Sequence, residues 1–255
     1  MSKIKKIFKT QAGDFTALQG ITTYFYPGEF VSVVGKSGSG KSTLVNMLTG
    51  IDHPTSGFVK VNGVAIHEMS ESKMSIWRGQ NLGIVFQFFQ LLPMLTIREN
   101  VMLPMDLSDS CPLGDRAERA DSLLRMVGLE AEADSLPGAI SGGQQQSAAI
   151  ARALANDPPI MIADEPTGNL DSQAATDVFE LFNQFASRGK TIVMVTHDPG
   201  LALRTNRTIL LSDGKLVDPN SPDYQRWLED VIVDSSTSPS GEHSIQAYPR
   251  DGANV

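Results

Sequence analysis

Short apolar runs rich in β-branched residues recur along the chain and predict strands that are covered on both faces. Near-continuous runs of this kind are typical of a parallel sheet, because helices pack on both of its sides. The predicted strands are 30–34, 82–86, 160–163, 191–195 and 208–211. Helical patterns separate several of them, so we expect an α/β fold with a mostly parallel sheet.

Apolar residues at helical spacing predict the intervening helices. The clearest case is 172–187, where the apolar residues share one face and a glycine follows the last turn. Between about 89 and 158 the strand pattern disappears, and helices are predicted at 115–127 and about 141–156. Two prolines follow the second of these helices and stop it. We therefore expect a helical subdomain inserted into the α/β core.

The two ends of the chain differ from this core. The first eight residues mix lysines with apolar residues, which favours a solvated first strand over a membrane-surface anchor. From 219 onward the sequence becomes rich in Pro and Ser. Apolar residues between 227 and 233 predict a short docked helix, and beyond 234 we expect disorder.

Composition narrows the class of protein. The chain has 255 residues, of which 41% are hydrophobic and 20% charged, as in a globular protein. Its net charge of −8 argues against a general nucleic-acid binder. The single cysteine, Cys111, rules out an internal disulfide and fits a reducing compartment. No apolar run approaches the roughly 18 residues of a membrane-spanning helix.

A glycine-rich loop predicts a ligand. Residues 35–42 read Gly-Lys-Ser-Gly-Ser-Gly-Lys-Ser and fit the pattern G-x-x-x-x-G-K-[ST] at every fixed position, between a predicted strand and a predicted helix. Glycines let backbone N–H groups turn around phosphates, and the helix start adds positive charge. Lys41 can reach the β- and γ-phosphates and Ser42 can ligate Mg²⁺. The loop therefore predicts a nucleoside triphosphate with Mg²⁺.

Two carboxylates end the predicted strand 160–163. Ligands bind at the ends of parallel strands beside a phosphate loop, so Asp164 is expected to hold Mg²⁺ through water. Glu165 is placed to orient or deprotonate the attacking water. The alternative is an acidic strand end in a turn with Pro166.

A second helix start has the features of an anion site. Ser141-Gly142-Gly143 opens the predicted helix with free N–H groups, a hydroxyl and the helix dipole. An ordinary Ser N-cap is the alternative. Since one nucleotide rarely needs two such helix starts, we expect the second to bind a nucleotide held by another subunit.

Together the motifs resemble those of ATP-binding-cassette (ABC) ATPase subunits over about residues 3–218. The phosphate loop, Gln87, the signature 141–144, the strand 160–165, the run Asn169-Leu170-Asp171 and His197 follow in family order. The resemblance implies a P-loop NTPase (RecA-like) core, an antiparallel N-terminal β region and an inserted helical subdomain. The expected parts are an ABC ATPase domain at 1–218, made of a core at about 1–88 and 159–218 and helices at about 89–158, and a partly disordered extension at 219–255.

The resemblance also implies roles for individual residues. Glu165 is the expected catalytic base and His197 the contact to the γ-phosphate, although His197 and Gln87 each also fit an ordinary structural role. The expected catalytic residues are Glu165, His197, Gln87 and Lys41. The expected metal ligands are Ser42, Gln87 and Asp164. The expected nucleotide-binding residues are Phe8, Gly35, Ser37, Gly38, Ser39, Gly40, Lys41, Ser42, Thr43, Ser141, Gly142, Gly143, Gln144 and Asp171. Phe8 would stack on adenine; Phe15 and Tyr24 are alternatives.

Three segments, 86–93, 95–101 and 167–172, resemble the branch that serves macrolide export, lipoprotein release, antimicrobial-peptide resistance and cell division. The resemblance implies a homodimer, or a heterodimer with another cassette, around two ATP molecules. It also implies a separate membrane permease that meets region 88–105, and a peripheral place on the cytoplasmic side of the membrane. Export, mechanical work on the permease and regulation all stay possible functions. A soluble cassette protein acting on ribosomes or DNA is disfavoured, because the sequence has one cassette and no heptad pattern.

Two positions depart from the family pattern. Ser147 stands where the signature helix usually has Arg, and Lys36 stands where Pro is common. Arg152 on the same helix is kept. Lys36 should leave phosphate binding intact because that position contributes its backbone. We still expect hydrolysis, while Ser147 leaves its rate open.

Overall fold

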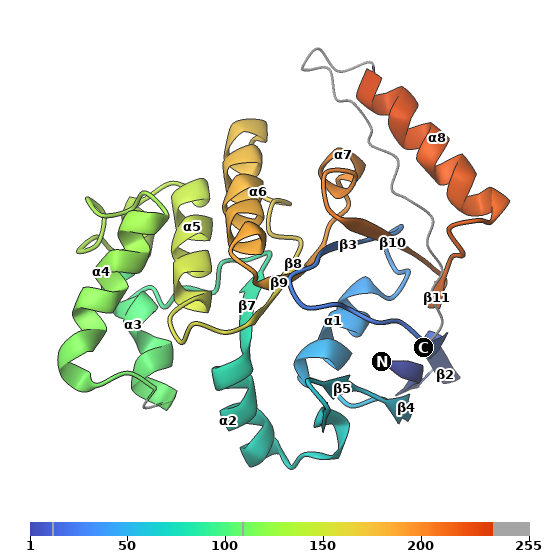
Figure 1. The fold of residues 1–255 in the computed structure, drawn as a ribbon, viewed down its shortest axis with the longest axis horizontal. Helices are drawn as coiled ribbons and strands as arrows, with labels where there is room; N and C mark the ends of the chain where they lie inside the picture. The colour runs from blue at the N-terminus through green and yellow to red at the C-terminus, as the bar shows by residue number, and fades with distance from the viewer. Residues whose placement is uncertain (12, 109, 237–255) are drawn as a thin grey trace.

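A six-stranded sheet forms the centre of the molecule in the computed structural model, which describes residues 1–11, 13–108 and 110–236 (Figure 1). Its order is β11-β10-β3-β9-β8-β7, and every pair from β10 to β7 is parallel. The parallel strands are β3 (Phe30–Val34), β7 (Leu82–Phe86), β8 (Ile160–Asp164), β9 (Thr191–Val195) and β10 (Arg207–Ser212). The short β11 (Lys215–Leu216) adds an antiparallel edge. The five predicted strands are thus confirmed.

Helices cover both faces of this sheet, as the apolar runs predicted. Along β9, Ile192 and Met194 join the cluster under α5 (Gly142–Ala153) and α6 (Ser172–Ser187). The alternate residues Val193 and Val195 join the cluster under α1 (Lys41–Thr49). Because successive side chains of a strand point to opposite faces, α1 lies on one side of the sheet and α5 and α6 on the other.

The N-terminal region is antiparallel. A three-stranded sheet of order β2-β1-β4 joins β1 (Ser2–Thr10) to β2 (Gly13–Ile21) and β4 (Ser56–Phe58). The hairpin of β5 (Lys60–Val61) and β6 (Val64–Ala65) and helix α2 (Glu71–Asn81) follow. Ile4 and Leu18 are fully buried against α1, whereas most other residues of the first strand are partly or fully exposed. With this region the predicted fold class is confirmed.

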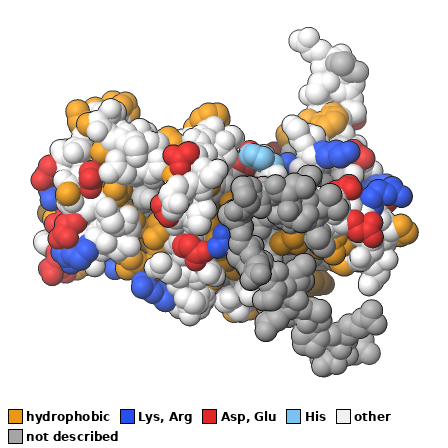
Figure 2. Space-filling view, turned by 90° about the horizontal axis from the view of Figure 1, so that it is seen from above, with side chains coloured by type: hydrophobic (Ala, Val, Ile, Leu, Met, Phe, Trp, Pro, Cys, Tyr) orange, Lys and Arg blue, Asp and Glu red, His pale blue; other side chains and the backbone are white. Residues whose placement is uncertain are grey.

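Between β7 and β8, the described residues form three α-helices, which make up one end of the molecule (Figure 1). They are α3 (Ile97–Ser108), α4 (Arg116–Met126) and α5, with single 3₁₀ turns at Leu113–Asp115 and Pro137–Ala139. The helices predicted at 115–127 and 141–156 appear as α4 and α5 with slightly tighter bounds, whereas α3 was not predicted. The domain boundaries at 88, 158 and 218 stay predictions. Seen from above, acidic side chains gather over this end (Figure 2).

The C-terminal part returns to the core. Short α7 (Pro199–Ala202) precedes β10, and α8 (Pro222–Ser236) packs through Tyr224 and Trp227 on Val34, Ala202 and Leu210. The predicted docked helix is confirmed and is longer than expected. The predicted disorder beyond 234 is wrong for 235 and 236, which belong to α8; residues 237–255 lie outside the described part. None of the described helices is long and apolar enough to cross a membrane.

Replacing Phe182 by Ala tests the core under α6. The Phe182 side chain is fully buried beside Phe30, so the truncation should lower the free energy of unfolding by about 3–5 kcal/mol, measured by urea denaturation. The matched control is Phe88→Ala, because Phe88 is 70% exposed and its loss should change stability by less than about 0.5 kcal/mol. Equal effects of the two variants would contradict this description of the core.

Candidate functional site

The loop between β3 and α1 has two positions at which only glycine fits. Gly35 has φ +154°, and a Cβ there would lie 2.2 Å from the carbonyl oxygen of Leu211. Gly40 has φ +105°, and a Cβ there would lie 2.7 Å from the carbonyl oxygen of Ala17. Both glycines are therefore required by the close approach of neighbouring backbone. Gly40 is also the N-cap of α1 and places the helix start directly after the loop.

Lys41 closes over this loop. Its side chain is 7% exposed and its Nζ donates hydrogen bonds to the carbonyl oxygens of Gly35, at 2.8 Å, and Lys36, at 3.2 Å. Within the described residues, the buried Ser39 hydroxyl has no hydrogen-bond partner. A buried polar atom without a partner is costly, and a phosphate oxygen in the loop would satisfy it. The loop therefore fits the predicted phosphates.

The parallel register brings the other motifs to the same edge of the sheet. Val195 pairs with Val33 on one side and with Asp164 on the other, and Asp164 pairs with Phe86. The residues that follow these strands are the phosphate loop, His197, Glu165 and Gln87. This edge, at the carboxyl ends of parallel strands, is where ligands bind in open α/β sheets.

Asp164 and Ser42 form the part of the site that fits a divalent cation. The Ser42 side chain interacts with the Asp164 carboxyl group, and Asp164 Oδ1 is buried without a hydrogen-bond partner within the described residues. Burial raises the pKa of Asp164 above its usual value; the interaction with Ser42 opposes the rise, and the Glu165 charge adds to it. A hydroxyl and an unsatisfied carboxylate oxygen are hard oxygen ligands of the kind Mg²⁺ prefers.

Glu165 and His197 lie side by side. Glu165 Oε2 is 3.4 Å from His197 Nδ1, and the Glu165 amide donates to the carbonyl oxygen of Val195 at 2.9 Å. Glu165 itself has φ +51°, an uncommon backbone conformation for a residue with a side chain. Its carboxylate is 23% exposed, so water can reach it while the backbone holds it in place. A carboxylate with this access and a neighbouring imidazole can accept a proton from water.

The Gln87 side chain lies near His197, and Gly168 leaves the space for this approach. A Cβ on Gly168 would lie 3.1 Å from Gln87 Nε2 and 3.4 Å from His197 Cε1, so Gly168 lets the two side chains approach each other. Asn169 Nδ2 donates to the Gln87 carbonyl oxygen at 3.1 Å. Neither Gly168 nor Asn169 was predicted to have a role at this site. Only their place in the run after Glu165 could have suggested one.

The signature helix begins with a capping box. The Gln144 amide donates to Ser141 Oγ at 3.3 Å and the Ser141 amide donates to Gln144 Oε1 at 2.9 Å. Ser141 is thus an N-cap, as the alternative interpretation held. Gln144 Nε2 also donates to Glu132. The amides of Gly142 and Gly143 have no partner within the described residues, so the helix start can still accept an anion.

The two helix starts that are predicted to bind phosphate lie on opposite faces of the central sheet. Lys41 begins α1 on one face of the sheet, and Gly142 begins α5 on the other. α5 packs against α3, α4, α6 and β7. In Figure 1, α5 lies on the left and α1 lies under the right half of the sheet. The geometry does not join the signature to the phosphate loop of the same chain.

The remaining residues predicted to contact the nucleotide are three aromatic candidates and Asp171. Phe8 is 37% exposed, pairs with Phe15 across β1 and β2, and has Lys6 Nζ 5.0 Å from its ring centroid. Phe15 and Tyr24 are more exposed, so all three aromatic candidates remain accessible. Asp171 Oδ1 accepts from the Ala174 amide at 2.9 Å and caps α6.

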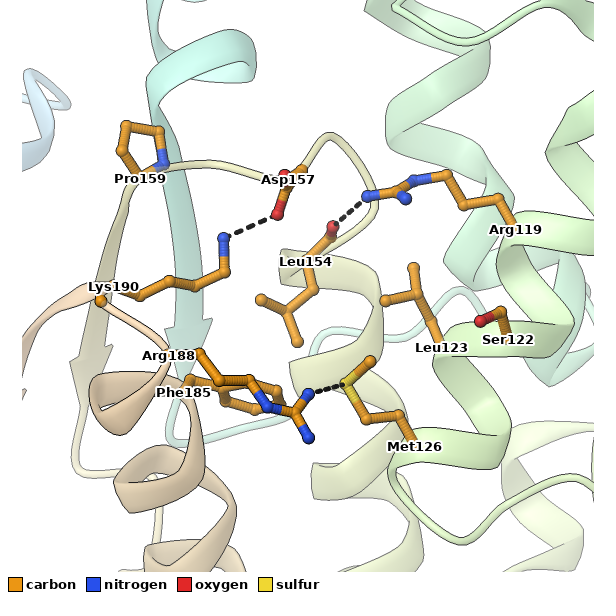
Figure 3. Close-up of a pocket in the computed structure, with 11 residues that line it drawn as sticks. Arg119, Ser122, Leu123, Met126, Leu154, Asp157, Pro159, Phe185, Arg188 and Lys190 are labelled. Atoms are coloured by element: carbon orange, nitrogen blue, oxygen red, sulfur yellow. Dashed lines mark hydrogen bonds and ion pairs between the residues drawn. The ribbon is translucent and has the colours of Figure 1, made fainter.

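A pocket of about 500 Å³ lies elsewhere, between α4 and the C-terminal ends of α5 and α6 (Figure 3). Leu123, Leu154 and Phe185 line it, and Arg119 and Lys190 reach across it to make contacts within the protein. None of its lining residues belongs to the phosphate loop, Gln87, 164–171 or His197. The candidate site is therefore the open edge of the sheet and not this pocket.

Several known proteins are similar to this chain over most of its length. The sequence profile described as ABC transporter matches residues 18–168. The lipoprotein-releasing system ATP-binding protein LolD of Anaeromyxobacter dehalogenans is 47% identical over 201 residues, covering 78% of this chain and 84% of LolD. The macrolide export ATP-binding/permease protein MacB of Mannheimia succiniciproducens is 40% identical, covering 86% of this chain and 34% of MacB.

One solved structure is similar to most of this chain. It is a dimeric ATP-binding cassette in a post-hydrolysis state, bound to ADP and Pi. It is 39% identical with a TM-score of 0.79 and covers 85% of this chain and 95% of its own.

The chain belongs to the ABC transporter family. It is an ATP-binding cassette that hydrolyses ATP, as the motifs predicted. Its similarity to LolD and MacB confirms the resemblance to the lipoprotein-release and macrolide-export branch.

Replacing Gly35 by Ala tests the loop. The added Cβ collides with the Leu211 carbonyl, so the loop must open and ATP affinity should fall by about tenfold or more, about 1.4 kcal/mol. The measurement is the shift in melting temperature on adding ATP. The control is Gly63→Ala in the β5–β6 hairpin, where φ is +79° but no atom lies within 4 Å of the new Cβ. Normal ATP stabilisation of Gly35→Ala would contradict this prediction.

Proposed function

We propose that this chain is the ATP-hydrolysing subunit of a transporter, that it dimerises around two Mg²⁺·ATP molecules, and that it drives a separate membrane permease. The observation that carries the proposal is the separation of the two helix starts. One chain has a phosphate loop on one face of the sheet and the signature helix start on the other. Two chains arranged head to tail would bring the loop of one to the signature of the other.

In each composite site, the phosphate loop would bind the β- and γ-phosphates through its backbone amides and Lys41. Ser42, Asp164 and Gln87 would hold Mg²⁺, which neutralises charge developing on the transferred phosphoryl group. Ser141, Gly142, Gly143 and Gln144 of the partner would complete the enclosure, with Asp171 in the loop between the two sites. The similar solved cassette is itself a dimer bound to ADP and Pi, which supports this assembly.

Glu165 would act as the general base. Its carboxylate accepts the proton of the attacking water while His197 contacts the γ-phosphate. The fixed backbone at Glu165, tied to Val195, keeps the carboxylate at the edge of the sheet. Phe8 would stack on the adenine ring.

The permease would dock on the segment between β7 and α3. Phe88 and Met94 are 70% and 73% exposed, and Leu92 is 39% exposed, so the segment presents apolar side chains outside the core. Exposed apolar side chains that gather on one segment are typical of a protein contact. MacB is described as an ATP-binding/permease protein, which supports the coupling of this cassette to a permease. The subunit would then lie peripherally on the cytoplasmic side of the membrane.

The Glu165→Gln variant tests the base. It removes the proton acceptor and leaves the phosphate loop unchanged, so turnover should fall by about 10²-fold or more while ATP binding is retained. Since ATP is no longer consumed, the dimer should persist, as measured by steady-state phosphate release and by size-exclusion chromatography with ATP. The control is Glu118→Gln, an exposed carboxylate on α4. Normal steady-state hydrolysis by Glu165→Gln would remove Glu165 from this role.

A double variant, Phe88→Asp with Met94→Asp, tests the docking segment. Two carboxylates would replace exposed apolar contacts, so co-purification of a membrane subunit from native membrane in mild detergent should be lost. Folding should be retained, because neither side chain belongs to the core. A wild-type chain that brings no membrane-embedded protein with it would refute the transporter proposal. A double variant that still brings it would refute this docking surface.

A further inference from the structure

The segment 87–96, which joins β7 to α3, is irregular but is tied down along its length. Its first residue, Gln87, lies against Gly168 close to His197, and Phe88 and Met94 are exposed. Its far end is fixed by Asn100, which is fully buried. The Asn100 amide group donates to the carbonyls of 92, 95 and 96 and accepts from the amide of 92. The near end, 87–90, is held differently.

Arg152 holds two carbonyls of the near end. Its guanidinium, on α5, donates to the Phe89 carbonyl oxygen at 2.8 Å and to the Gln90 carbonyl oxygen at 2.5 Å. Gln90 has φ +53°, a conformation that side chains adopt at a cost, and the contact with Arg152 helps to maintain it. Within the described residues no carboxylate lies within 4.0 Å of this guanidinium, so these backbone contacts are its only strong partners.

Asn169 holds the third carbonyl. Its Nδ2 donates to the Gln87 carbonyl oxygen at 3.1 Å, and its neighbour Gly168 lies against the Gln87 side chain. Asn169 belongs to the run between Glu165 and Asp171. The near end of the segment is thus held from two directions, by the signature helix and by the run that follows Glu165.

We propose that Arg152 and Asn169 are positioning residues that act together on Gln87. Their contacts fix the backbone of 87, 89 and 90, so that the Gln87 side chain faces the nucleotide site while Phe88 remains exposed on the other side. Side chains that orient a metal ligand influence metal affinity although they do not touch the metal. The link to the permease and the role of Gln87 as a metal ligand rest on the proposed function above; the contacts that hold 87, 89 and 90 do not.

The first experiment measures metal binding directly. Mn²⁺, in place of Mg²⁺, is titrated into the full chain with a non-hydrolysable ATP analogue and followed by electron paramagnetic resonance. Asn169→Ala and Arg152→Gln should each weaken Mn²⁺ binding by about tenfold. Binding of the analogue in EDTA should stay within about twofold, because the phosphate loop is unchanged. Unchanged Mn²⁺ affinity in Asn169→Ala would overturn the proposal.

Matched controls separate positioning from folding. Arg188→Gln removes a guanidinium whose contact is Met126 Sδ at 3.5 Å in the distant pocket (Figure 3). Asn183→Ala removes an exposed amide on α6. Neither control should change Mn²⁺ affinity. A tenfold loss in either control would show a general structural effect and overturn the assignment. Asn169 is exposed, so its variant keeps the test valid if Arg152→Gln unfolds.

A double-mutant cycle with Gln87 completes the test. If Asn169 acts through Gln87, the pair Asn169→Ala with Gln87→Ala should bind Mn²⁺ no more weakly than Gln87→Ala alone. Fully additive losses would overturn the proposal. When a permease co-purifies, Asn169→Ala should also reduce its stimulation of ATP hydrolysis. When none does, the transporter proposal fails and the Mn²⁺ result still decides the positioning role.

Discussion

The parallel register of the central sheet is the constraint on which the rest of the molecule depends. Val195 stands between Val33 and Asp164, and Asp164 stands beside Phe86. This alignment sends four chain segments to one edge. A slip of one residue would turn Ile192 from the α5 face to the α1 face and move every following side chain with it. Packing on both faces therefore fixes the geometry of the site.

Patterns of short range predicted much of this fold. Helix α6 matches its prediction because Phe179, Phe182 and Phe185 form one buried face, and the strands match because their apolar runs are continuous. Helix α3 was missed because its pattern contains Pro104 and a fully buried Asn100. The side-chain amide of Asn100 donates hydrogen bonds to carbonyl oxygens of the preceding loop. Hydrophobic periodicity cannot predict a contact of this kind.

The sequence likewise predicted some features of the candidate site and not others. Glycine positions and strand ends could be predicted from local pattern, and the structure brings Lys41, Ser42, Asp164 and Glu165 to one edge. The contacts between distant segments could not be predicted from local pattern. The approach of Glu165 to His197 and the hydrogen bond from Asn169 to Gln87 each join residues that no local spacing relates. Their roles in catalysis stay predictions, while their adjacency follows from the register.

Helix α5 connects the two parts of this arrangement. Its first turn offers amides to an anion, and Arg152 near its other end holds the segment after Gln87. Twelve residues make a rigid rod of about 18 Å, and the fully buried run from Ala148 to Ala151 anchors its middle. One rigid element therefore joins the first turn of the signature to the segment after Gln87. Ser147 lies between the two ends, and its side chain takes part neither in the capping box of Ser141 and Gln144 nor in the hydrogen bonds of Arg152.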